Sequence, residues 1–181
     1  MPLKITIPAR ELYDQKANRF ITIKETNVQL EHSLISISKW ESKWHKSFFT
    51  KEQKTEEESI DYIRCMCLTQ NIDPNVFYGI TAEDAKRISD YIADPMTATT
   101  FSHQDKKKSR EIITSELIYF YMVDFGIPFD PCQKWHFNRL MTLIEVCSVK
   151  NQPPKKMKQK DWLRQRNSLN KARRAKAGHH G

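Results

Sequence analysis

The spacing of the apolar residues changes near residue 35, and this change restricts the available folds more than any other feature of the sequence. Before it, apolar and polar positions alternate, for example at Leu3, Ile5 and Ile7. Such alternation is typical of a strand with one side in a core and the other in water. The sequence therefore predicts a small antiparallel β element in residues 1–35.

After residue 35, apolar residues recur every three or four positions, as they do along one face of a helix. Ser38 with Glu41, and Thr55 with Glu58, have the spacing of a capping box. Thr81 is a third candidate for an N-cap. We therefore expect helices to begin near these three hydroxyl residues.

Two further helices are predicted later in the chain. The first begins at about Ser109 and contains the run 117–123, which is apolar on every side and predicts a central helix that is covered all round. Gly126 is placed to end this helix in the left-handed conformation. Asp130 and Pro131 then have the residue types of an N-cap and a first-turn proline for the next helix. The predicted core face of that helix is Phe137, Leu140, Met141, Leu143, Ile144 and Cys147.

The positive charge is concentrated near the C-terminal end. The net charge is +8, but residues 150–176 alone carry 11 lysines and arginines against one acid. The other residues carry 19 basic and 21 acidic side chains, so together they are nearly neutral. Pro153 and Pro154 interrupt the chain just before the basic run, which predicts that the charged segment is a separate helix.

The predicted fold class is therefore α+β and predominantly α-helical. A small N-terminal antiparallel β element (1–35) precedes a bundle of about five helices (36–149), and the two form a single compact body (1–149). A basic C-terminal helical arm (150–181) follows this body.

The sequence contains none of the common signatures of catalysis. It has no GxSxG nucleophile motif, no glycine-rich phosphate loop, no HExxH and no carboxylate-rich metal loop. Cys65 and Cys67 are one residue too close for a CxxC zinc knuckle, and His136 has no orienting partner or nucleophile near it in sequence. We therefore expect no catalytic site, no metal site and no cofactor, and a protein that is not an enzyme.

The apolar content favours a soluble protein. Residues 1–16 contain no apolar leader segment, and the longest apolar run, 117–123, is far shorter than the roughly 20 residues of a membrane span. Four cysteines lie within apolar stretches, which is typical of a reducing compartment. The sequence predicts a cytosolic protein that does not enter membranes.

Several large apolar residues are candidates for contact with a partner. Trp135 and Val146 lie off the core face of their predicted helix, while Trp40 is either a core residue or a contact residue. Trp162 and Leu169 form a narrow stripe along the predicted arm helix. The candidate basic contacts of the arm are Lys155, Lys156, Lys158, Lys160, Arg164, Arg166, Lys171, Arg173 and Arg174.

The arm has three interpretations on charge alone. It is a nucleic-acid-binding helix that neutralises phosphates, with Trp162 available to stack on a base. Alternatively it is a protein-binding arm that is steered toward an acidic partner. A solvated and partly disordered tail is the third interpretation.

Three segments together resemble a known family. They are LEHSLISISKWESKW (30–44), GIPFDPCQKWHFNRLMTLIEVCSVKNQPPKKM (126–157) and RQRNSLNKARR (164–174). In this order they are similar to the tail assembly chaperones of long-tailed bacteriophages. The resemblance implies a small non-enzymatic viral protein that acts in the host bacterial cytoplasm. It would bind the long tape measure protein and keep it soluble during tail assembly.

Two other functions stay open at this point. One is a nucleic-acid-binding protein that uses the basic C-terminal helix, and the other is a structural neck or tail subunit of the virion. The sequence also leaves open whether the protein forms a homo-oligomer.

Overall fold

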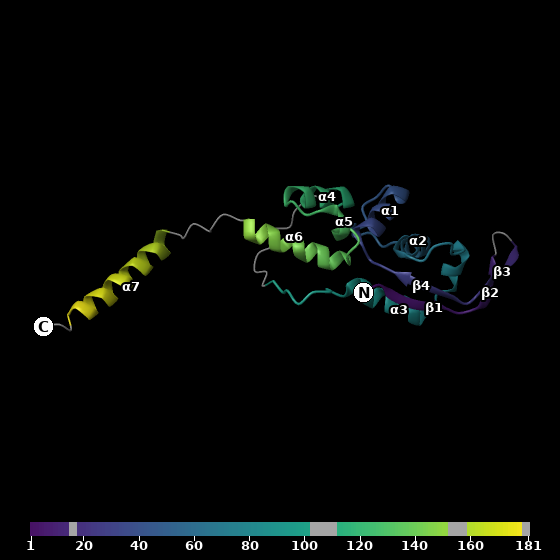
Figure 1. Ribbon diagram of the computed structural model, residues 1–181, viewed down its shortest axis with the longest axis horizontal. Helices are drawn as coiled ribbons and strands as arrows, with labels where there is room; N and C mark the ends of the chain where they lie inside the picture. Colours follow the sequence, from purple (N-terminus) through teal and green to yellow (C-terminus); the bar gives the residue numbers. More distant parts are fainter. Residues whose placement is uncertain (15–17, 102–111, 152–158, 179–181) are drawn as a thin grey trace. The chain divides into compact units, whose positions relative to one another are not determined.

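The computed structural model describes residues 1–14, 18–101, 112–151 and 159–178, and these residues have a mixed α+β fold (Figure 1). The chain divides into two units, Met1–Cys147 and Ser148–Gly181, and each is considered by itself. The boundary between them lies inside a helix, four residues before that helix ends at Asn151.

The N-terminal strands form one interrupted antiparallel ribbon. The strands are β1 (Leu3–Ile7), β2 (Arg10–Asp14), β3 (Arg19–Ile23) and β4 (Thr26–Leu30). β1 pairs with β4 and β2 pairs with β3, in two small two-stranded sheets. Ile7 lies opposite Thr26 and Arg10 opposite Ile23, so both sheets keep the same register across the break between them. The predicted antiparallel β element is confirmed.

Eight helical segments follow within the described parts of the chain. They are α1 (Leu34–Trp44), α2 (Glu56–Met66), the 3₁₀ helix η1 (Pro74–Gly79), α3 (Ala82–Ala93), α4 (Ser115–Asp124), α5 (Phe129–Cys132), α6 (Phe137–Asn151) and α7 (Gln159–Ala177). In Figure 1, α3 lies along the ribbon, and α3 and η1 both contact β1. Gly79 permits this close approach, because a Cβ at that position would lie 2.9 Å from Ile7 and 3.0 Å from Ile23.

Two of the three predicted helix starts are confirmed, and the first is wrong. Thr55 and Glu58 form a reciprocal capping box on α2, and the Thr81 side chain accepts from the amide of Asp84 at the start of α3. However, α1 begins at Leu34 and not at Ser38, because Ser33 is its cap. A local serine box at the end of β4 therefore begins the helix inside the segment expected to be β-rich.

The predicted helix with Asp130 as its cap is also wrong. Only the four-residue helix α5 spans this position, and the long helix α6 starts at Phe137, seven residues after Asp130. The amide of Phe137 donates to the carbonyl of His32 at 2.7 Å. A contact with a residue 105 positions earlier in the chain therefore fixes where α6 begins.

The core lies between the ribbon and the helices of the first unit. Its largest fully buried side chains are Trp40, Ile7, Ile23, Leu30, Leu34, Ile37, Met66, Ile118, Met122 and Leu140. On the predicted core face of α6, Phe137, Leu140 and Ile144 are buried, and the other three residues are partly buried against the same core.

Candidate functional site

The predicted contact residues of the body contribute little exposed apolar surface. Trp40 is fully buried, and its indole N–H donates to the carbonyl of Glu58 at 2.9 Å, so it is a core residue. Trp135 is partly buried against the core, and the guanidinium of Arg139 lies 4.3 Å from its ring centroid. Val146 is likewise only partly exposed.

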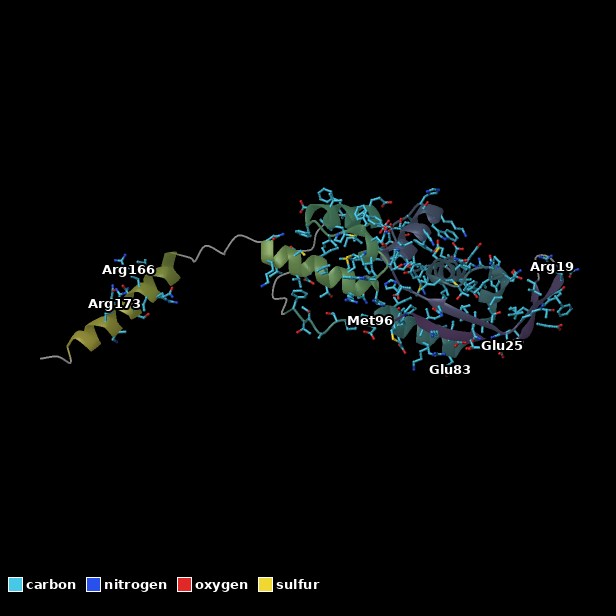
Figure 2. All side chains as sticks on the ribbon, viewed as in Figure 1. Arg19, Glu25, Glu83, Met96, Arg166 and Arg173 are labelled. Atoms are coloured by element: carbon cyan, nitrogen blue, oxygen red, sulfur yellow. The ribbon has the colours of Figure 1, made fainter. Side chains whose placement is uncertain are left out.

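Only part of the predicted basic arm falls within the described residues. On α7, Arg164, Arg166, Lys171 and Arg173 are exposed, and two of them are labelled in Figure 2. Leu169 is 53% exposed. The remaining predicted contact residues of the arm lie outside the described residues or side chains: Lys155, Lys156, Lys158, Lys160, Trp162 and Arg174.

A different apolar surface, on α4, is the strongest candidate site. Ile118 and Met122 on one side of α4 are fully buried, whereas Phe120 and Val123 on the other side are 60% and 64% exposed. The prediction that this helix is covered on every side is therefore wrong. Its predicted start near Ser109 is also wrong: Ser109 itself lies outside the described residues, but α4 begins only at Ser115, with Thr114 as its cap. The left-handed end at Gly126 is confirmed, with φ of +65°.

Neighbouring side chains extend the apolar surface beyond α4. The ring of Tyr119 meets that of Phe129 edge-on, with 5.3 Å between centroids, and Phe129 is 44% exposed. Just before the helix, Ile112 is 71% exposed. Ile112 and Ile113 also line an open pocket of about 450 Å³. We name the exposed pair Phe120 and Val123 the α4 surface. Several exposed apolar residues gathered in one region of a protein are typical of an interaction site.

A buried carboxylate holds α4 in place. Glu41 of α1 is 7% exposed, and its two oxygens accept the amides of Phe48 and Ser115, each at 2.7 Å. The Ser47 hydroxyl also donates to the carbonyl of Ile113. Since Ser115 opens α4, the Glu41 carboxylate lies at the positive end of the helix dipole. The α4 surface therefore rests on an anchored helix.

We expect Glu41→Gln to lower the free energy of unfolding by about 2 kcal/mol, because the amide can accept through one oxygen only and leaves a buried N–H unsatisfied. Chemical denaturation of the full chain measures this loss. The control is Glu25→Gln, an exposed position labelled in Figure 2, which should change stability little. Equal stability of the two variants would contradict the anchoring role of Glu41.

A pair of buried histidines lies between the ribbon, α2, α3 and α6. His32 and His136 are 3% and 6% exposed, and their ring centroids are 5.2 Å apart. Burial, with His136 nearby, lowers the pKa of His32 to about 3, and burial also lowers the pKa of His136. His32 is hydrogen-bonded to the Tyr62 hydroxyl, and Nε2 of His136 lies 3.0 Å from the Tyr91 carbonyl oxygen. Both rings are therefore neutral core groups.

Comparison of the chain with known protein families, with curated proteins and with solved structures finds no match. Among the described residues, no group of three or more His, Cys, Asp or Glu side chains is arranged to hold a metal ion. None of the described helices combines the length and apolar content needed to cross a bilayer. The α4 surface is thus the feature on which a functional argument can rest.

Sequence reasoning missed this surface although its signal was present. The run 117–123 is apolar on every side, and this pattern describes equally well a helix that is fully covered and a helix that exposes one apolar face to a partner. Only the burial of Ile118 and Met122, together with the exposure of Phe120 and Val123, separates the two cases.

Proposed function

We propose that this protein is a tail assembly chaperone that binds the tape measure protein of a long-tailed bacteriophage and keeps it soluble during tail assembly. The observation that carries this proposal is the exposure of Phe120 and Val123 on an anchored helix. The three segments that resemble the family point to the same function. In this proposal the protein acts by binding alone, in the host bacterial cytoplasm.

The physical requirement on such a chaperone is modest. It must cover apolar surface of a long client before assembly and release that surface when tail subunits replace it. Moderate affinity at each contact is sufficient, because many copies act along one long client. A helical body that presents the α4 surface, with a basic arm that is available to contact acidic parts of the client, meets this requirement.

Co-expression with the tape measure protein encoded by the same phage genome tests the proposal. We expect the client to be soluble, and to co-purify, only when this protein is present. Phe120→Ser with Val123→Ser should reduce the soluble client about tenfold or more, because the apolar contact is lost. The yield of client in the soluble fraction is the measurement.

A matched control replaces the same two residue types elsewhere. Phe20 and Val149 are 71% and 52% exposed, so Phe20→Ser with Val149→Ser removes similar apolar area at two positions that are not on α4. This variant should keep the client soluble. If the wild-type protein neither solubilises nor co-purifies with the client, the chaperone proposal is wrong.

Nucleic-acid binding is the second candidate function. Its supporting observation is the exposure of Arg164, Arg166, Lys171 and Arg173 along α7. Binding of the purified protein to duplex DNA that weakens steeply with salt, in the absence of any effect on the client, would favour this function. Recovery of the protein from purified virions would instead favour a structural neck or tail subunit.

A further inference from the structure

We infer that the α4 surface selects amphipathic helices in which basic residues flank an apolar stripe. This inference rests on the proposed function and names the class of client segment that the surface accepts. It is carried by the positions of the two acidic residues on α4 and by the absence of an ion pair between them and any other described residue.

Acidic side chains lie at both ends of the apolar stripe on α4. Glu116 precedes Phe120 by four residues, and Asp124 directly follows Val123; all four are exposed. At about 1.5 Å of rise per residue, the two acidic positions are roughly 12 Å apart along the helix. A partner that covers the stripe therefore meets a negative charge at each end.

Both carboxylates are available to a partner. Within the described parts of the chain, neither Glu116 nor Asp124 forms an ion pair, and the hydrogen bond of Glu116 is a long one of 3.4 Å from the Ser115 hydroxyl. By contrast, Asp61 on α2 pairs with Lys43 at 2.6 Å, and Asp130 on α5 pairs with Lys134 at 2.5 Å. The acids of α4 can therefore pair with a basic group of a partner without first losing an ion pair with a described residue.

The negative charges of Glu116 and Asp124 disfavour binding of a second copy of this chain at the α4 surface. A two-fold axis brings identical surfaces together. If the two α4 helices were antiparallel, Glu116 would face Asp124 of the second copy; if they were parallel, each acid would face itself. Both arrangements place like charges together beside a desolvated apolar contact, where repulsion is strongest. An anionic membrane is repelled for the same reason.

The need to satisfy backbone hydrogen bonds restricts the secondary structure of a bound segment. The α4 surface consists of side chains on a helix, so it offers no row of backbone groups to a bound segment. A partner chain pressed against Phe120 and Val123 must satisfy its own N–H and C=O groups. A helix does so internally, and a helix with apolar residues at i, i+3 or i+4, and i+7 matches the stripe. Lysine or arginine beside the ends of its apolar stripe would then pair with Glu116 and Asp124.

Two synthetic peptides test the selection with the purified full-length protein. One is an 18-residue amphipathic helix with a leucine stripe and four flanking lysines, and the other carries glutamine in place of those lysines. We expect the lysine peptide to bind at least about tenfold more tightly at low salt, a difference of about 1.4 kcal/mol. Fluorescence anisotropy of labelled peptides gives both dissociation constants.

Charge reversal on the protein tests whether Glu116 and Asp124 cause the tighter binding of the lysine peptide. Glu116→Lys with Asp124→Lys should weaken binding of the lysine peptide at least about tenfold. Glu25→Lys with Glu83→Lys changes the net charge equally at two exposed positions labelled in Figure 2, and should change the affinity less than about twofold. Unchanged thermal melting of both variants excludes unfolding as the cause.

The outcomes separate this inference from the proposed function. Equal affinity for the two peptides, no binding of either, or equal losses in both charge-reversed variants would overturn the charge selection, even if the client is solubilised in co-expression. Conversely, charge selection without any effect on the client would support the α4 surface as a helix-binding site and overturn its assignment to the tape measure protein.

Discussion

Replacing Trp40 with alanine is expected to lower the free energy of unfolding by about 4 kcal/mol, enough to unfold a marginally stable domain. Trp40 has no exposed surface, and its ring meets that of Phe48 edge-on at a centroid distance of 5.4 Å. Its indole also donates to the Glu58 carbonyl, which joins α1 to α2. The substitution removes both the packing and this hydrogen bond.

Urea denaturation followed by circular dichroism measures this effect on the full chain. Trp40→Phe keeps much of the apolar contact and is expected to cost less than half as much. Trp135→Ala removes a tryptophan that is only partly buried and should cost about 1 kcal/mol. If Trp40→Ala destabilises the protein no more than Trp135→Ala, the central position of Trp40 in the core is wrong.

Acidification from pH 7 to pH 5 is expected to destabilise the protein by about 2 kcal/mol through His32 alone. In the folded state burial lowers the pKa of His32 to about 3, whereas the unfolded chain has the ordinary value of 6.5. Below pH 6.5 the unfolded chain therefore takes up a proton that the folded protein excludes. The stabilising effect is complete above pH 6.5 and is lost progressively as the pH falls toward 3. The pKa of His136 is lowered as well, so it acts in the same direction.

Denaturation midpoints at several pH values between 7 and 5 measure this dependence. The pKa values of the Asp61 and Glu58 carboxyls are lowered, so their stabilising effect is lost only at more acidic pH. His32→Asn should flatten the profile in this window. His45→Asn is the control, because His45 is exposed in a left-handed conformation that asparagine also adopts. A wild-type slope in the His32 variant would contradict the prediction.

The parts of the fold that could be predicted depend on neighbours in sequence. The capping box of Thr55 and Glu58, and the left-handed end at Gly126, involve residues within one turn of each other. Alternation along the β-ribbon is equally local. The start of α1 was missed although it is also local, because the box formed by Ser33 and Ser36 uses two serines and not the usual Glu or Gln partner.

The parts that could not be predicted depend on contacts between distant segments. The α6 helix begins where the amide of Phe137 reaches the carbonyl of His32, and α4 is held by Glu41, 74 residues before the amide that it accepts. The spacing of the apolar residues within α4 or α6 does not indicate which distant residues hold these helices. The observed fold is mixed α+β, as predicted. The finer predictions, a bundle of about five helices and a basic arm, stay predictions.

The sequence by itself determined the class of fold, the position of the excess positive charge and the apolar character of residues 117–123. The tertiary structure decided which side of that segment is covered. Ile118 and Met122 are buried, so Phe120 and Val123, on the opposite side of the same helix, face solvent. The physical reason is that apolar composition gives the free energy available from burial, whereas long-range packing decides which apolar residues are buried within the chain and which are left for a partner.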